Sequence, residues 1–500
     1  MPKFCQHDNK NIDSLRVISK SNNFSLATGF GAHRDFRKAS KMMIDQVLSD
    51  LSDPDGILLV IGMYTKSKKE INKDLELLAR KFNNIPMFGI QQVGLFASDG
   101  YKCQYGFKAV ASLAWKGIDF FPTKIKNIRF RSKKKGKIYG KTNNKIIKNE
   151  KKKTFNIFFP PGIYFPPKIL YALQGRSRIN PLGFYNTRFA NWKVFRPINS
   201  LFSIFQEYLN LGIPYSSFWQ FVEGYRTQTD VNNFAGAFGA NVDTFARSYQ
   251  FLNWKATSSD LVSGIFSGKN LKIGVGLGVG LDPHQKEYLK IKKCLKGGII
   301  TSFTDPTLST KEKLTANQTY LKKMNIESDI WTRNTESNLG FSVFTPYCVL
   351  QKQGNAINDY NKSESIYNEL LDEEPSLYFL MPNKNMKATM MSAPDQIIKK
   401  ISNNEVEAFL GHQSADAIVQ SVSKAINMAL NGSKITKPKG GLFIECYNRA
   451  QALEERFPEL LKKNVESFPF PFLGLITTGE IAPKQFPSVC SSLVTVIFGS

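Results

Sequence analysis

The sequence predicts an α/β protein with mixed β-sheets flanked by helices and with a strand–helix–strand unit repeated in the N- and C-terminal parts. Three observations support this fold class. Fully apolar runs have the length of buried strands, and apolar positions at helical spacing lie between them. Glycines and prolines recur at the same intervals in both parts. A helix between two strands favours a parallel pair with a right-handed crossover.

The N-terminal unit begins with apolar positions at helical spacing over residues 39–51. The run 57–61 is apolar throughout, as expected for a strand buried on both faces. A second helical stripe covers residues 71–82, and the next strand begins at Pro86 and ends at Gly94. The order is therefore helix, strand, helix, strand.

The C-terminal unit has the same layout. The apolar strand 442–444 is followed by a helical stripe over 453–461 and by a second strand over 471–475, which ends at Gly479. Both units have turn-forming glycine or proline at the strand boundaries.

The intervals within the two units agree. Gly56 to Pro86 and Gly441 to Pro471 both span 30 positions. From each proline the next glycine of the pattern follows after 3 positions, and the strand-ending glycine after a further 5. Three matched intervals indicate an internal structural repeat.

The predicted organisation is a tail over residues 1–37, an N-terminal domain over 38–290 and a C-terminal domain over 291–500. The N-terminal domain carries a basic insert, 124–153, and an aromatic-rich insert, about 160–225. The basic insert has 14 Lys or Arg and one acidic residue, so it holds half of the net charge of +26. Its low complexity predicts a mobile surface loop between strands.

Three further segments have clear patterns. Residues 248–254 and 260–266 are predicted to be antiparallel strands that form a hairpin. Residues 272–281 alternate glycine with Val, Ile or Leu, which predicts a strand packed closely against another element. Residues 415–429 form a strongly periodic helix, which ends at Gly432.

Several classes of protein are not expected. The six cysteines are scattered, which is typical of reduced thiols, and no signal peptide or transmembrane segment is predicted, so we expect a cytoplasmic protein. None of the four histidines has a partner at metal-ligand spacing, and residues 264–270 match a phosphate-binding loop poorly. The sequence therefore predicts no metal, no cofactor and no enzyme of a recognisable catalytic type.

Three motifs in order resemble the FIST family of sensory proteins, both its N-terminal and its C-terminal domain. They are the glycine-rich run 236–241, the Cys-x-x-Arg at residues 446–449 and the Gly-Glu-Ile at residues 479–481. The family has adjacent glycines followed by Asp in the first motif, so the separated glycines and Asn241 are departures. The resemblance implies an intracellular sensory protein that binds a small, amino-acid-like ligand and signals through a separate partner.

The predicted ligand site lies where strands end, because open α/β sheets bind ligands beyond the carboxyl ends of their strands. Cys446 and Arg449 come at a strand-to-helix junction, and Arg449 would pair with a ligand carboxylate. Glu480 would accept from an amino group of the ligand. The alternative is structural: a buried Cys446 and an Arg449–Glu480 salt bridge that joins two strands.

Glycines and polar residues at the other strand ends complete the predicted site. Gly94 and Gly479 would permit sharp turns or close backbone approach. Gln92, Thr477 and Thr478 would supply polar contacts, and Gly239 and Asn241 of the glycine-rich run are the remaining candidates. Turn formation alone is the alternative for the glycines.

Three other functions stay open. The first is an enzyme with Cys446 as a thiol nucleophile. The second is a nucleic-acid or membrane-surface binder that contacts polyanions through Lys133, Lys134 and Lys135. The third is a scaffold for protein interactions that has no small ligand.

Overall fold

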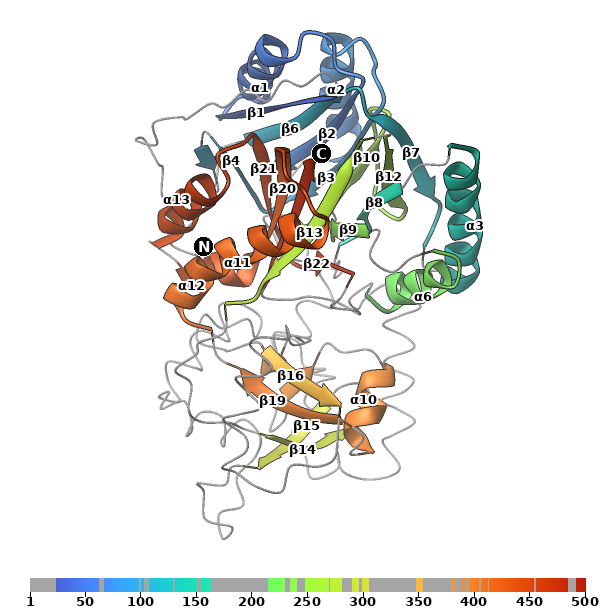
Figure 1. Cartoon of the computed structure of the whole chain (residues 1–500), viewed down its shortest axis with the longest axis vertical. Helices are drawn as coiled ribbons and strands as arrows, with labels where there is room; N and C mark the ends of the chain where they lie inside the picture. The colour runs from blue at the N-terminus through green and yellow to red at the C-terminus, as the bar shows by residue number, and fades with distance from the viewer. Residues whose placement is uncertain are drawn as a thin grey trace.

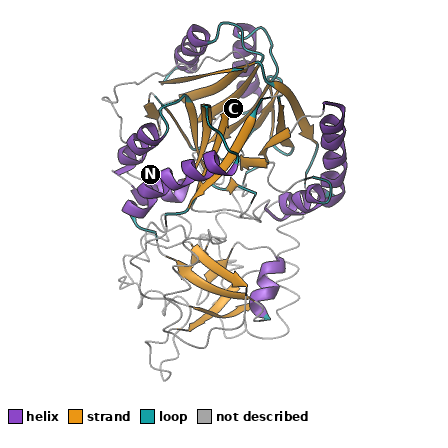
Figure 2. Ribbon diagram, viewed as in Figure 1, coloured by secondary structure: helices purple, strands orange, loops and turns teal. Residues whose placement is uncertain are grey.

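The structure is a computed structural model. It describes residues 24–62, 67–98, 100–102, 108–128, 131–150, 154–162, 215–229, 234–240, 248–268, 270–280, 290–295, 299–304, 348–353, 380–382, 389–391, 395–403, 406–411, 413–453, 456–483 and 492–500. The predicted α/β class with mixed sheets is confirmed: three sheets combine parallel and antiparallel pairs, and helices cover them (Figures 1 and 2).

The first sheet contains the N-terminal unit and has the strand order β1-β6-β2-β3-β10-β11. Two helices lie on it: α1 (Phe36–Asp50), which begins at the N-cap Asp35, and α2 (Lys68–Lys81), which begins at the capping box of Ser67 and Glu70. The strands are β1 (Ser25–His33), β2 (Gly56–Gly62), β3 (Met87–Gln92), β6 (Lys108–Lys116), β10 (Gln250–Leu252) and β11 (Lys255–Thr257).

The second sheet contains the C-terminal unit and has the order β13-β23-β20-β21-β4-β5. Its helices are α11 (Ala415–Gly432), α12 (Tyr447–Leu453) and α13 (Phe457–Ser467). Its strands are β4 (Gly94–Ala97), β5 (Gly100–Lys102), β13 (Lys272–Gly278), β20 (Pro438–Cys446), β21 (Phe472–Thr477) and β23 (Leu493–Gly499).

The two sheets have the same topology, strand for strand. In each, the central pair is parallel, β2 with β3 and β20 with β21, and every other neighbour is antiparallel. The predicted repeat and its parallel pairs are therefore confirmed. The hairpin β4–β5 and the strand β13 complete the C-terminal unit's sheet, so this sheet takes strands from both sides of the predicted boundary at residue 290.

The predicted alignment of the two units is wrong by one residue at its start. The amide of Ile57 donates to the Pro86 carbonyl at 3.1 Å, and the amide of Gly441 donates to the Pro471 carbonyl at 2.9 Å. Ile57, not Gly56, is therefore equivalent to Gly441. The connection is one residue longer in the second unit, residues 447–471 against 63–86, and it contains two helices where the first unit has one.

The third sheet has the order β22-β9-β8-β12-β7, with β8 and β9 parallel. It ends on a two-residue strand from the C-terminal part, which pairs with β9. Its strands are β7 (Asp119–Ile125), β8 (Thr154–Phe159), β9 (Phe234–Ala237), β12 (Leu261–Ser267) and β22 (Glu480–Ile481).

Two sequence predictions about this region are wrong. The basic insert is not a loop over its length, because α3 (Ser132–Glu150) occupies most of it and packs on α6 (Tyr215–Arg226). The predicted hairpin of 248–254 with 260–266 does not form either. β10 pairs with β3 and β11 in the first sheet, whereas β12 lies between β7 and β8 in the third.

A fourth sheet, antiparallel throughout its described pairs, comes from the segment between β13 and α11. Its order is β16-β19-β14-β15-β18-β17, and α10 (Asp395–Ser402) lies beside it (Figure 1). Its strands are β14 (Lys290–Leu295), β15 (Ile299–Thr304), β16 (Cys348–Gln353), β17 (Leu380–Pro382), β18 (Thr389–Met391) and β19 (Val406–Gly411).

The first three sheets share one central core, and each has helices on its outer face (Figure 1). Alternate residues of a strand point to opposite faces, so Leu58 and Val60 of β2 enter the central core while Leu59 packs under α1 and α2. Strands buried on both faces have to be apolar throughout, which is the pattern in the sequence.

Candidate functional site

The carboxyl ends of the repeated strands meet at one backbone carbonyl. The Nε2 of Gln92, the last residue of β3, donates to the Phe238 carbonyl at 3.0 Å, and the Oγ1 of Thr477, the last residue of β21, donates to it at 2.7 Å. Phe238 directly follows β9 of the third sheet. The ends of strands from all three sheets therefore converge here.

Buried polar side chains surround this point. A Cβ placed on Gly239 would lie 2.5 Å from Ser248 Oγ and 2.6 Å from Gln250 Nε2, so these side chains lie against the Gly239 backbone and would have to move for any larger residue. Gln92 and Gln250 are both 0% exposed. Among the residues that the structure describes, Gln92 Oε1, Ser248 Oγ and both polar atoms of Gln250 have no hydrogen-bond partner.

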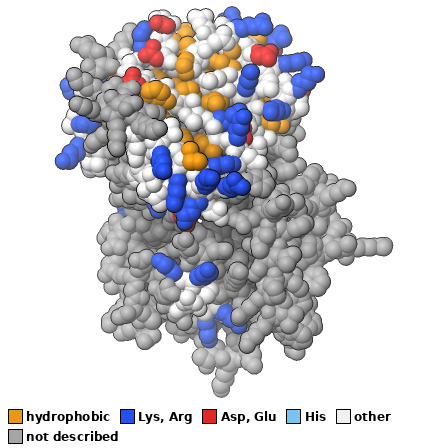
Figure 3. All heavy atoms as spheres, turned by 90° about the vertical axis from the view of Figure 1, so that its right-hand side faces the viewer, with side chains coloured by type: hydrophobic (Ala, Val, Ile, Leu, Met, Phe, Trp, Pro, Cys, Tyr) orange, Lys and Arg blue, Asp and Glu red, His pale blue; other side chains and the backbone are white. Residues whose placement is uncertain are grey.

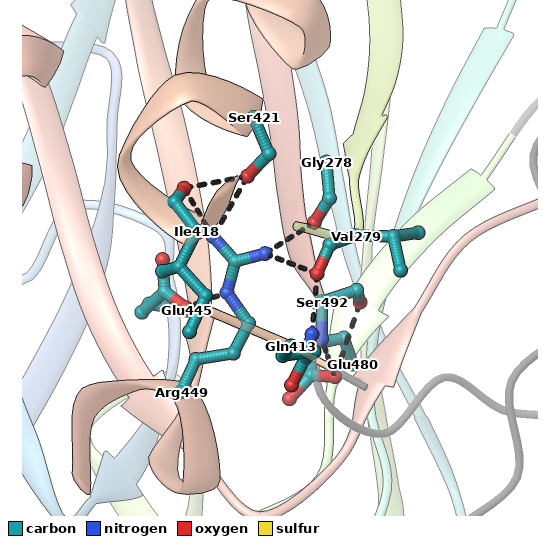
Figure 4. Close-up of polar contacts among 9 residues, drawn as sticks. All are labelled: Gly278, Val279, Gln413, Ile418, Ser421, Glu445, Arg449, Glu480 and Ser492. Carbon is teal, nitrogen blue, oxygen red and sulfur yellow. Dashed lines mark hydrogen bonds and ion pairs between the residues drawn. The ribbon is translucent and has the colours of Figure 1, made fainter. Parts of the chain in front are cut away.

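Arg449 lies in the first turn of α12 and is completely buried. Its guanidinium uses all five of its N–H donors on protein atoms (Figure 4). The acceptors are Glu445 Oε1 at 2.6 Å, the carbonyls of Gly278, Val279 and Ile418 at 2.7, 2.9 and 3.2 Å, and Ser421 Oγ at 3.0 Å. Arg449 thus joins the end of β20 to the end of β13 and the start of α11.

This geometry corrects both sequence interpretations of Arg449. A guanidinium has five donors, so none is left for a ligand carboxylate. Its ion-pair partner is Glu445, not Glu480. Sequence reasoning missed Glu445, although an acid within the apolar strand 442–446, four positions before an arginine, is the signal that could have identified it.

Glu480 forms a second buried carboxyl group close to the first. It is 0% exposed, and its Oε2 accepts from the Ser492 amide at 3.4 Å and from Ser492 Oγ at 3.2 Å. The Cys446 thiol also hydrogen-bonds to Glu480, so the predicted proximity of these two residues is found. Glu445 Oε2 and Glu480 Oε1 have no hydrogen-bond partner within the described ranges.

Of the two buried carboxyl groups, Glu445 pairs with an arginine and Glu480 does not, and this difference affects their pKa values. Burial raises the pKa of Glu445, while the adjacent Arg449 charge acts in the opposite direction. Burial and then the Glu445 charge raise the pKa of Glu480 well above its usual value. Glu480 has no cationic partner in the described part of the chain, so its surroundings favour the protonated form more strongly than those of Glu445.

Replacement of Glu480 by glutamine is expected to change how stability depends on pH. The folded state holds the Glu480 proton more tightly than the unfolded chain, so this stabilisation is complete below the ordinary pKa of 4.5 and is lost as pH rises through the folded-state value. Glutamine stays neutral, so the stability of Glu480→Gln relative to wild type should rise as pH increases from 4.5 to the folded-state pKa, by at most about 1.4 kcal/mol per pH unit, and should not change above it.

Urea unfolding between about pH 5 and about pH 8 measures this difference. Glu466→Gln is the matched control, because Glu466 lies on α13 with its side chain 54% exposed. Parallel pH profiles for wild type and Glu480→Gln would show that Glu480 is already ionised in the folded protein.

Of the remaining predicted site residues, some lie at the converging strand ends and others do not. Gly479 is buried, and its carbonyl accepts from the Phe238 amide at 2.9 Å, so it belongs to the converging strand ends together with the adjacent Thr478. Gly94 begins β4 opposite Ile476, where the chain passes from the first sheet to the second. Neither glycine has a positive φ; among the described residues the glycines that do are Gly117 and Gly280. Asn241 lies outside the described residues.

No protein-family model and no curated protein matches the chain. One solved structure that is similar in part is the structure of PurLQS from Thermotoga maritima, with a TM-score of 0.20 and 8% identity over 99% of this chain and 76% of that one. Similarity at that level carries no argument about fold or function. The FIST resemblance therefore stays a prediction. No helix among the described residues is long and apolar enough to span a membrane.

Proposed function

We propose that this chain binds a small molecule with N–H or O–H donors, such as an amine or an amino acid through its ammonium group, beyond the carboxyl ends of β3 and β21. The supporting observation is the set of fully buried acceptor oxygens around Gly239 that lack a partner in the described structure, Gln92 Oε1 and Gln250 Oε1. A buried polar group without a partner costs about 1–3 kcal/mol, so a complementary group is expected there.

The geometry favours donors on the ligand over a carboxylate. All five donors of Arg449 are used within the protein, which leaves none for a carboxylate, whereas the buried oxygens Gln92 Oε1 and Gln250 Oε1 require a donor from the ligand. Glu480 pairs with Ala237 at the edge of the same region, so an ammonium group bound nearby would favour its ionised form. The carboxylate-bearing ligand expected from the sequence is therefore revised to a ligand recognised by its donors.

In this proposal the chain is a sensory protein of the FIST type, and a separate protein receives the signal. The alternative of a Cys446 enzyme has less support. The Cys446 side chain is 1% exposed and hydrogen-bonds to the Glu480 carboxyl, so it lacks both the access and the electropositive surroundings of a reactive thiol.

A thermal-shift panel tests the proposal. Amines and amino acids should raise the unfolding temperature by a few degrees, because a ligand at about 100 times its Kd stabilises the folded state by about 2.7 kcal/mol. Carboxylic acids without an amino or hydroxyl group should produce no shift. The Gln250→Leu variant should lose the shift, since it removes a buried acceptor beside Gly239.

Asn464→Leu is the matched control. Asn464 is also a buried amide with no hydrogen-bond partner in the described residues, but it lies on α13 at the outer face of the second sheet. It should keep the full shift. Absence of any shift with wild-type protein, or an equal shift in both variants, would contradict the proposed site.

A further inference from the structure

The helix α3 lies at the right-hand edge of the molecule in Figure 1, and Figure 3, which views that side, shows Lys and Arg side chains gathered on it. Four lysines of its first described turns are exposed: Lys133, Lys134, Lys137 and Lys141. At 100° per residue they lie within one arc of about 100°. Exposed Lys124, Lys126 and Arg131 precede the helix, and residues 124–144 contain no acidic side chain.

The opposite face of α3 is fixed to the protein. A Cβ on Gly136 would lie 1.9 Å from the Phe221 carbonyl, and one on Gly224 would lie 2.1 Å from the Lys133 carbonyl, so α3 and α6 touch backbone to backbone. Tyr139 then donates to Asn156 at 2.8 Å in the third sheet. The lysines therefore lie on a helix that is packed against the protein, not on a loop.

Most of these cations have no neutralising neighbour. Lys133 is 3.3 Å from Glu223, and Lys124 is 3.8 Å from Asp260, but no other cation of the face has an ion pair within the described residues. Lys135, which the sequence suggested as a polyanion contact, is turned away: its Nζ donates to the carbonyls of Lys126 and Asn127 at 2.8 and 2.6 Å.

The composition of the face indicates which anion it fits. Ile138 lies beside these lysines and is 55% exposed, and the described residues contain only one other large hydrophobic side chain so exposed, Met42. No described aromatic is exposed there to stack on a base. Lysines act as point charges without the bidentate geometry that arginine gives to base recognition. An arc of lysines with one exposed apolar side chain at its edge suits a lipid bilayer with anionic headgroups.

We infer that the exposed face of α3 binds anionic phospholipid bilayers, with the lysines on the headgroups and Ile138 entering the interface. This does not depend on the proposed ligand site. Each lysine near an anionic surface increases partitioning by about fivefold. With some loss from non-additivity, removal of four charges should weaken binding by about 100-fold.

Vesicle flotation of the full chain tests this inference. Vesicles of phosphatidylcholine with about 30% phosphatidylserine should carry the protein at low salt. They should release it near 300 mM salt, where the Debye length is about 6 Å compared with about 10 Å at 100 mM. Phosphatidylcholine vesicles should not carry it. The variant Lys133→Gln, Lys134→Gln, Lys137→Gln, Lys141→Gln should lose about 100-fold in partitioning.

Two controls make the result specific. Replacing the exposed α2 lysines Lys68, Lys69, Lys73 and Lys81 by glutamine removes the same charge, and this variant should bind as wild type within about twofold. Ile138→Ser keeps every charge and should weaken binding to anionic vesicles by about fivefold.

Three results would overturn the inference: no binding of wild type to the anionic vesicles, equal losses in the α3 and α2 variants, or Ile138→Ser binding as tightly as wild type. Tighter binding to duplex DNA than to anionic vesicles at equal salt would instead assign the face to nucleic acid.

Discussion

Replacement of Arg449 by leucine is expected to lower the free energy of unfolding by about 3–5 kcal/mol. The substitution leaves Glu445 as a buried carboxylate without its cation and removes the donors from three buried carbonyls. Because these carbonyls belong to the end of β13 and the start of α11, the loss should loosen the second sheet from its helix. Urea unfolding, followed by tryptophan fluorescence and by far-UV circular dichroism, measures the change.

Arg456→Leu is the matched control for this prediction. Arg456 also contacts two carboxylates, Asp416 and Glu459, each at 2.7 Å, but its side chain is 41% exposed. Water replaces such contacts, so the loss should be small. Equal losses in the two variants would mean that the buried network contributes no more than a surface ion pair.

The repeated unit could be predicted from the sequence because its signals are local. Strands buried on both faces are apolar throughout, and the helices α1, α2, α11 and α13 bury one stripe each. The pairing between distant elements had no local signal. Nothing within residues 94–102 shows that β4 leaves the first sheet and pairs with β21 of the second.

The structure brings several predicted site residues together and gives Arg449 other partners than the sequence suggested. Strand ends carry polar residues, so Gln92, Gly239, Cys446 and Glu480 could be selected from the sequence. The sequence could not show that all the donors of Arg449 are used within the protein, since three of its acceptors are backbone carbonyls, which every residue has. Sequence spacing identifies side chains, whereas a carbonyl becomes an acceptor only through the tertiary fold.

The helix α3 was missed for a related reason. Glycine lowers helix propensity by about 1 kcal/mol per residue, and Gly136 and Gly140 lie inside a lysine-rich segment, so local preference does not favour a helix there. Tertiary packing decides the outcome. The same glycines allow α3 to approach the α6 backbone, and burial of Tyr139 against the third sheet stabilises the pair.

The second prediction with a large expected effect also concerns a glycine at which a helix packs closely on a strand. Replacement of Gly276 by alanine is expected to destabilise the protein by about 3 kcal/mol or more, at the upper end of overpacking effects. The new Cβ would lie 1.7 Å from the Ala425 carbonyl of α11, half the 3.4 Å at which ordinary contact begins. The helix cannot move away at this point alone, because it is also close to Gly274 and Gly278, whose Cβ positions lie 1.9 Å from the Ala429 carbonyl and 2.5 Å from the Ser421 carbonyl.

Gly432→Ala provides the control within the same helix. A Cβ on Gly432 has no heavy atom within 4 Å, and alanine restricts the unfolded chain, so this change should stabilise the protein by about 0.5 kcal/mol. The repeat supplies a second test: Gly31 of β1 faces α1 as Gly276 faces α11, with its Cβ position 1.9 Å from the Ala39 carbonyl. Gly31→Ala should therefore lose about as much stability as Gly276→Ala in urea unfolding. If both variants unfold at the wild-type midpoint, the two sheets do not depend on glycine for helix packing, and the structural equivalence of the two units fails at its closest contact.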